Sequence, residues 1–200
     1  MKRNSLRWRA ITYSVILMML VSSSCSFIVI AEATPTVVPT STPERLTLIG
    51  GEIDPCLLVN SEEVENVLGV KVTSEAKLLD YMPSCKYISI TNDQAVLLII
   101  SAITDLSIKK ANQPWLKEGN VHISAVDVYE RQKMVVSSSE IYKFKDLDNL
   151  GDQAFQYESS FLIISVLRNN IFYQFNGRIE YGVDYDTLKK LIKIGLERMP

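Results

Sequence analysis

Residues 161–175, FLIISVLRNNIFYQF, decide the fold class of this chain. Residues 161–167 and 171–175 are rich in β-branched and aromatic side chains, which favour pleated strands. Asn169 and Asn170 lie between them and tolerate the positive φ angles of a type I′ turn, so the segment predicts a β-hairpin. Alternation in the second strand would place Ile171, Tyr173 and Phe175 on one face and Phe172, Gln174 and Asn176 on the other.

A second hairpin is predicted earlier in the chain. Residues 85–90 alternate as a strand does, and residues 95–103 are apolar on both faces, as in a central strand covered on both sides. Asn92 and Asp93 between them are turn-forming residues. Together the two hairpins indicate an antiparallel sheet.

Two helices flank these hairpins. Asn60, with Glu63 three residues later, has the spacing of a capping box, and Gly69 supplies the end of this short helix. Asp184 caps a last helix whose apolar residues recur on one face. Both helices therefore have a side that can pack on the sheet.

A third helix, residues 125–137, is predicted from a cap formed by Ser124 and Asp127. Residues 121–129 also alternate passably, so a strand is the alternative there. The order of helices and hairpins predicts an α+β fold, an antiparallel sheet of hairpins with helices packed on it. The residues at helical spacing are Ala125, Val128, Tyr129, Gln132, Val135 and Val136.

The charge of the chain is unevenly distributed. Of the 21 basic residues, 4 lie in the first 25 positions, which hold no acid, so the remainder has 17 basic against 23 acidic residues. Nucleic-acid binding requires clustered positive charge that replaces phosphate counterions. The mildly acidic body of the chain therefore argues against a nucleic-acid partner.

The N-terminus has the features of an export signal. Lys2, Arg3, Arg7 and Arg9 precede an apolar stretch, residues 11–21. Small residues then lead into Cys25, and this pattern resembles a lipobox, in which the cysteine is lipidated and residues 1–25 hold the signal peptide and the lipidation site. Ser22 occupies the position where leucine is usual, and apolar residues follow Cys25.

Two other interpretations of the N-terminus remain open. The uncharged residues 11–31 are long enough to span a bilayer as an uncleaved signal anchor. Ordinary cleavage near Ala31 or Ala33 would instead release a secreted protein. All three interpretations place residues 45–200 outside the cell, as one extracytoplasmic domain behind a Pro/Thr-rich linker, residues 26–44.

Cysteine usage fits an oxidising location. If Cys25 is lipidated or removed, Cys56 and Cys85 remain as an even pair, and an exported pair is read as a disulfide. A metal or redox pair is the alternative, but the chain has no C-x-x-C motif and only one histidine, His122. A four-ligand zinc site would therefore lack ligands. We expect no metal and no cofactor.

Three short motifs carry a family resemblance: residues 54–58 (DPCLL), 85–87 (CKY) and 150–155 (LGDQAF). Together they resemble a large group of cell-envelope lipoproteins best known from actinobacteria. In that group the two cysteine motifs are joined by a disulfide, and a G-D-x-A turn leads into a hairpin and a final helix. The resemblance covers most of residues 52–198 and implies a compact α+β sandwich, broadly similar to the PsbP-like fold. Function in the group is mostly unknown, and related domains are extracellular sensor modules of bacterial kinases.

Gly151 and Asp152 of the last motif are predicted to form a structural turn. A calcium loop starting at Asp146 is the alternative, because acids and glycine occur at EF-hand-like positions. Leu150 and Tyr157 stand where two oxygen ligands would be required. The turn is therefore the preferred interpretation.

Catalytic motifs are not evident. The chain has no G-x-S-x-G elbow and no phosphate-binding glycine loop. His122 has no serine or cysteine partner that the sequence identifies. Glu62, Glu63 and Glu65 start a helix, where carboxylates are explained by the helix dipole. We therefore predict no catalytic residues and no enzyme.

The functional expectation is a non-catalytic binding or sensor module that recognises a small molecule, a peptide or an envelope protein. Aromatic residues crowd the second half of the chain, and one that finds no core could line a pocket. A structural or accessory protein that acts through a protein partner is the alternative. An apolar cleft would favour the first, a flat apolar patch the second, and paired carboxylates of raised pKa an enzyme.

Overall fold

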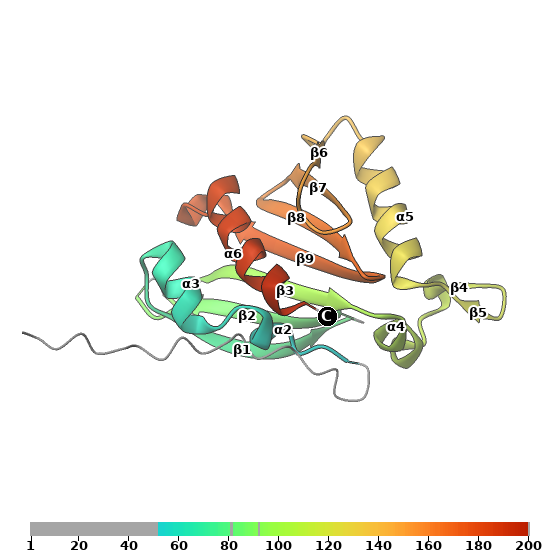
Figure 1. Ribbon diagram of the computed structural model, residues 1–200, viewed down its shortest axis with the longest axis horizontal. Coiled ribbons are helices and arrows are strands. Elements are labelled where there is room, and N and C mark those ends of the chain that lie inside the picture. Colours follow the sequence, from blue (N-terminus) through green and yellow to red (C-terminus); the bar gives the residue numbers. More distant parts are fainter. Residues whose placement is uncertain (1–51, 81, 92, 200) are drawn as a thin grey trace, which may run out of the picture. The chain divides into compact units, whose positions relative to one another are not determined.

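The computed structural model describes residues 52–80, 82–91 and 93–199 (Figure 1). The predicted signal segment, Cys25 and the linker lie outside the described residues. Among the helices described, none is both long and apolar enough to cross a membrane. The described part has the predicted α+β architecture, a seven-stranded antiparallel sheet with helices packed on it.

The sheet consists of two meanders that meet at its centre. Its strand order is β1-β2-β3-β9-β8-β7-β6, and every neighbouring pair is antiparallel. A separate two-stranded ribbon pairs β4 with β5. The strands are β1 (Val72–Leu79), β2 (Met82–Ser89), β3 (Val96–Ile103), β4 (Lys117–Glu118), β5 (Val121–His122), β6 (Lys145–Leu147), β7 (Gln153–Glu158), β8 (Phe161–Arg168) and β9 (Ile171–Arg178).

Both predicted hairpins are confirmed. Strands β8 and β9 close at the pair Arg168 and Ile171, and the two turn residues have φ of +49° at Asn169 and +60° at Asn170. Strands β2 and β3 also pair, with a bulge at Leu97, because Tyr87 faces Leu98 while Ile88 faces Val96. The extra residue explains why the neighbours Leu97 and Leu98 are both buried.

The three predicted helices are confirmed, and their caps are those expected. Asn60 and Glu63 exchange backbone-to-side-chain bonds of 2.8 and 2.9 Å, and Asp184 accepts from Thr187 N at 2.8 Å. Ser124 and Asp127 form a further capping box, so the helical interpretation of residues 125–137 is correct and the strand is confined to β5. The helices are α2 (Pro55–Leu58), α3 (Ser61–Leu68), α4 (Asp105–Ala111), α5 (Ala125–Ser137) and α6 (Tyr185–Arg198), with 3-10 turns η1 (Pro114–Leu116) and η2 (Ile179–Tyr181).

Helices cover both faces of the sheet and create two hydrophobic clusters. Helices α2, α3 and α6 lie over one face of the sheet (Figure 1). The cluster on that face includes the side chains of Tyr87, Tyr173 and Phe175. The other joins α4, η1 and α5 to Phe155 and Phe172 on the opposite face. The predicted alternation of β9 is therefore confirmed, with Phe172 and Tyr173 in different clusters.

Strands β1, β6 and β7 and helix α4 lie outside the predicted elements. Strand β1 is an edge strand in which only Val72 is buried. An exposed strand does not need a buried apolar face, and the sequence of β1 accordingly has little apolar alternation. Strand β6 has three residues, too few for a periodic pattern. These strands depend on their neighbours for pairing rather than on a local signal.

Candidate functional site

A cleft of about 450 Å³ lies between α5 and the sheet. Helix α5 contributes one wall with Val128, Val135 and Val136. Strand β9 contributes Phe172 and Gln174 to the opposite side. The remaining lining side chains are Met82, Trp115, Ile123, Arg131, Gln132, Tyr142 and Tyr157. Binding sites for small molecules have volumes in this range and are likewise lined mainly by apolar and aromatic side chains.

The sequence of α5 explains where the cleft forms. Tyr129 is fully buried, and its ring lies 5.1 Å from Phe155 and 5.5 Å from Phe172, measured between centroids. One helical turn later the same face carries Gln132, a polar side chain. The helix therefore packs directly on the sheet at Tyr129 and presents a hydrogen-bonding group to the cleft at Gln132.

Two contacts determine the orientation of the Gln132 amide. Its Nε2 donates to Tyr157 Oη at 3.1 Å, and its Oε1 accepts from Ser165 Oγ at 3.2 Å. Burial raises the pKa of the Tyr157 phenol to about 12, with a smaller contribution from neighbouring Tyr142. Tyr157 therefore stays protonated at neutral pH, and its own hydrogen finds no acceptor among the described residues.

Gln174 is the other glutamine of the cleft, and only 8 % of it is exposed. On β9 it lies between Ser101 of β3 and Ser165 of β8. Its Oε1 accepts a long bond of 3.5 Å from Asn176, whereas its Nε2 has no partner among the residues that the structure describes. The side chain thus offers a donor to the cleft.

Gln174 belongs to a row of buried polar residues that crosses four neighbouring strands. Ser84 on β2 and Ser101 on β3 share a bond of 2.8 Å between their hydroxyls, and Ser165 on β8 bonds to Gln132. Buried polar groups are costly unless they are hydrogen-bonded. The row is therefore largely satisfied by contacts within the protein, and the Gln174 amide nitrogen is the exception.

Arg131 is the one charged residue in the described lining of the cleft. Its guanidinium forms an ion pair with Glu118, which does not line the cleft. Among the described residues no carboxylate, thiol or imidazole lines the cleft. The arrangement can therefore supply apolar contact and hydrogen bonds to a bound molecule.

The acidic residues of α3 do not converge on a common site. Glu63 binds the guanidinium of Arg198, and Glu65 accepts from Lys71 Nζ at 2.6 Å and from Val72 N at 3.1 Å. The hydrogen bond from Lys71 is the main reason why the pKa of Glu65 is lowered. These carboxylates connect α3 to its neighbours in the fold.

His122 lies on β5 opposite Lys117 and outside the α5 cleft. Its Nε2 is buried without a partner among the described residues. His122 lines a separate hollow together with Asp105 and Lys109 on α4 and Ser124 at the start of α5. Asp105 is already engaged there, because its carboxylate accepts from Ala125 N at 2.8 Å.

Gly151 and Asp152 support the turn between β8 and β9. Gly151 has φ of +66°, and a Cβ atom there would lie 2.6 Å from the carbonyl oxygen of Leu167. Asp152 N donates to that oxygen at 2.8 Å, and its carboxylate accepts from Asn169 N at 2.7 Å. Asp146, where the calcium alternative begins, lies in β6 and pairs with Lys133 Nζ at 2.8 Å.

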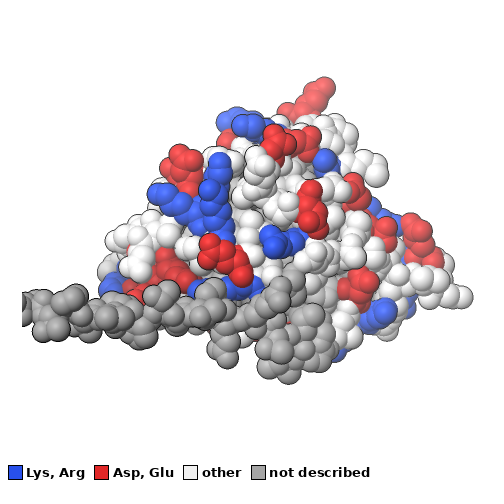
Figure 2. All heavy atoms as spheres, viewed as in Figure 1, with Lys and Arg blue, Asp and Glu red and all other residues white. Residues whose placement is uncertain are grey.

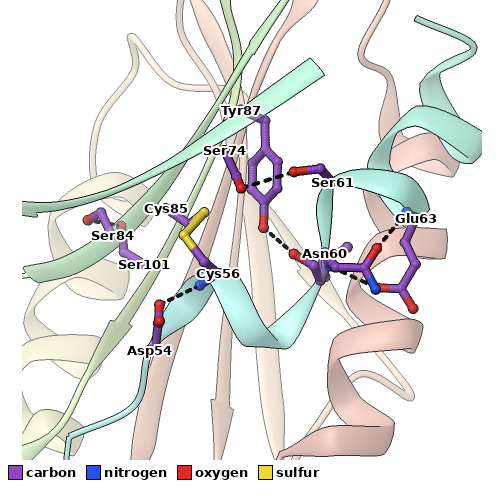
Figure 3. Close-up of a disulfide and its surroundings, with 11 residues drawn as sticks. Asp54, Cys56, Asn60, Ser61, Glu63, Ser74, Ser84, Cys85, Tyr87 and Ser101 are labelled. Carbon is purple, nitrogen blue, oxygen red and sulfur yellow. Dashed lines mark hydrogen bonds between the residues drawn. A yellow bond between two sulfur atoms is a disulfide. The ribbon is translucent and has the colours of Figure 1, made fainter. Parts of the chain in front are cut away.

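The disulfide between Cys56 and Cys85 joins α2 to β2, with 5.0 Å between the Cα atoms (Figure 3). Nearby, the Asp54 carboxylate accepts from Cys56 N at 2.9 Å. Tyr87, two residues after the second cysteine, donates its hydroxyl to the carbonyl of Val59. The region is a structural connection on the face of the sheet opposite the cleft.

Gln132, Tyr157 and Ser165 are site residues that sequence reasoning did not identify. The available signal for Gln132 was a polar residue within the apolar stripe of a helix. Ser165 similarly interrupts the apolar strand 161–167. Neither signal shows that the two side chains meet, since they are 33 residues apart in the chain.

Comparison with known proteins identifies no relative. No protein-family model, no curated protein and no solved structure matches the chain.

Proposed function

We propose that this domain is a non-catalytic binding or sensor module of the bacterial cell envelope, which holds a small, largely apolar molecule in the α5 cleft. The observation that carries the proposal is the cleft itself, which has apolar walls and two glutamine amides in its lining. Hydrogen bonds to Tyr157 and Ser165 orient the amide of Gln132, and a bond from Asn176 orients that of Gln174. Binding sites for small molecules combine an apolar lining with a few placed polar groups in this way.

Export and anchoring form part of the proposal. The N-terminal segment, the Pro/Thr-rich linker and the Cys56–Cys85 disulfide are together typical of an extracytoplasmic domain. We propose lipidation at Cys25 as the anchor, with an uncleaved signal anchor or secretion as alternatives. The resemblance to actinobacterial envelope lipoproteins and to the PsbP-like fold supports the same assignment.

The surface charge supports a partner other than nucleic acid. On the face shown in Figure 2, Lys and Arg side chains are interspersed with Asp and Glu. Seven cations are paired with acids in the part of the chain that the structure describes, among them Lys71, Lys110, Arg131 and Lys143. Binding to a phosphate backbone would need a continuous basic surface.

An accessory role through a protein partner is the second candidate. Met134, Val135 and Ile141 are exposed near the end of α5, although their side chains are apolar. Clustered apolar exposure is typical of protein interaction sites. Val135 also lines the cleft, so a ligand and a partner would use adjoining surfaces.

Dye binding to the full chain, purified from bacterial membranes, tests the proposed function. N-phenyl-1-naphthylamine is an uncharged dye that fluoresces in apolar sites, and we expect it to bind saturably. Val135→Trp should fill the cleft and weaken dye affinity by about tenfold or more, a difference of about 1.4 kcal/mol.

Met134→Trp is the matched control. Met134 and Val135 are neighbours with similar exposure, 65 % and 62 %, but only Val135 lines the cleft. The control should bind dye as the original chain does, in the same detergent. Absence of saturable binding, or equal loss in both variants, would overturn the proposed function.

A further inference from the structure

The chemistry of the α5 cleft points to a particular class of ligand. We propose that the ligand is an uncharged amphipathic molecule with a hydrocarbon body and a carbonyl group, as in an acyl amide or ester, and that Gln174 Nε2 donates to the carbonyl oxygen. This inference rests on the proposed binding function. It adds which part of the ligand is recognised and by which side chain.

Gln174 is the central observation. The residue is more than nine-tenths buried and lines the cleft, and the hydrogen bond described for its side chain is to the amide oxygen, which leaves the nitrogen without a partner among the described residues. Its oxygen is turned toward Asn176 by the bond at 3.5 Å. The nitrogen itself keeps some exposure, so a ligand in the cleft can reach it, and a carbonyl oxygen of the ligand provides the acceptor that it lacks.

Tyr157 provides a second donor from β7. Its hydroxyl oxygen already accepts from Gln132, whose amide is oriented by Ser165, so the phenolic hydrogen is left for another acceptor. Gln132 in turn uses both ends of its amide within the protein. The described polar side chains of the cleft therefore offer donors to the ligand more readily than acceptors.

The charges around the cleft favour an uncharged ligand. A cationic amine would find no carboxylate among the described residues that line the cleft. An anionic headgroup would meet Arg131, which is already neutralised by Glu118. Burying a charge without a partner is costly, whereas a neutral carbonyl requires only a hydrogen bond. The apolar walls formed by Val128, Val136 and Phe172 receive the hydrocarbon part.

Competition with three probes of one chain length tests the ligand class. Octanamide, octanoate and octylamine share the same hydrocarbon chain and differ in charge and in carbonyl content. Each is titrated against N-phenyl-1-naphthylamine bound to the full chain. We expect octanamide to displace the dye at a concentration about tenfold lower than either ion, which corresponds to one hydrogen bond.

A leucine substitution tests the role of Gln174. Gln174→Leu keeps the approximate size of the side chain and removes the donor, so octanamide should lose about tenfold in affinity while the dye still binds. Gln156→Leu is the matched control, because Gln156 lies between Phe155 and Tyr157 on β7 and so faces the other side of the sheet. The control should retain the preference for octanamide.

The outcomes separate this inference from the proposed function. If the dye does not bind, the proposed function fails. If the dye binds but the three probes compete equally, or an ion competes best, only the ligand class is overturned. Should Gln174→Leu not fold, the side-chain amide signals of Gln174 are followed by NMR in the original chain. Octanamide should shift them, and no shift at saturation contradicts the role of Gln174.

Discussion

Replacing Tyr87 by phenylalanine should destabilise the domain, whereas the same change at Tyr173 should not. Both tyrosines are fully buried in the cluster beneath α2, α3 and α6. The Tyr87 hydroxyl donates to the carbonyl of Val59, which follows α2. The Tyr173 hydroxyl has no hydrogen-bond partner among the described residues. Each substitution therefore removes a hydroxyl group from the same hydrophobic cluster, but only the hydroxyl of Tyr87 is hydrogen-bonded.

The expected magnitudes follow from that difference. Tyr87→Phe leaves the buried Val59 carbonyl without this donor, which costs about 1–3 kcal/mol. Tyr173→Phe removes a buried hydroxyl that lacks a partner, so the free energy of unfolding should stay the same or increase. For a domain of this size each kcal/mol corresponds to a shift in Tm of about 2–4 °C.

Urea unfolding followed by circular dichroism measures both variants, with the disulfide kept oxidised. The midpoint should fall for Tyr87→Phe and not for Tyr173→Phe, with the m-value unchanged in both. Tyr129→Phe is a further control in the other cluster, because its hydroxyl is also buried without a described partner. Equal losses for Tyr87 and Tyr173 would refute the hydrogen-bond argument.

Three further predictions concern stability. Replacing Cys56 and Cys85 by serine opens a loop with a sequence separation of 29 residues. The chain-entropy model predicts that the free energy of unfolding then falls by about 3–4 kcal/mol, measured by denaturant unfolding, and an unchanged midpoint would contradict this. Arg198→Met breaks bonds to Glu63 and to the Leu58 carbonyl, the latter at 2.8 Å, and should cost about 1.5–3 kcal/mol, with Arg198→Lys recovering little because it lacks the planar fork. Burial raises the pKa of Tyr157 to about 12 and also raises the pKa values of Tyr87, Tyr129 and Tyr173. Tyrosines of the unfolded chain lose their protons near pH 10, so the free energy of unfolding should be unaffected by these groups below about pH 10 and should fall as the pH rises toward 12. A urea midpoint at pH 11 no lower than at pH 8 would count against that last prediction.

Local chemistry made much of this fold predictable. The Asn169–Asn170 turn has the positive φ angles that its residue types favour, and the helix beginning after Asn60 has its predicted capping box and stop. These features depend on residues a few positions apart, so the sequence alone contains their cause. Cysteine parity likewise predicted the pair Cys56 and Cys85, because few other roles suited two cysteines in a chain with a predicted export signal.

Other features required contacts between distant segments. Strand β1 is held by pairing with β2 and has little apolar alternation of its own, so no local pattern indicates it. The bulge at Leu97 is likewise a property of the register between two strands.

The candidate site belongs almost wholly to this second group. The alternation of β9 predicted that Phe172 and Gln174 share a face, but not that α5 would cover it. Only the tertiary structure brings Gln132 to Ser165 and Tyr157 and leaves the Gln174 amide nitrogen facing a cleft. The physical reason is that turns and caps are determined by bonds between near neighbours, whereas a cleft is the space left where two surfaces meet, and its shape depends on every side chain between them.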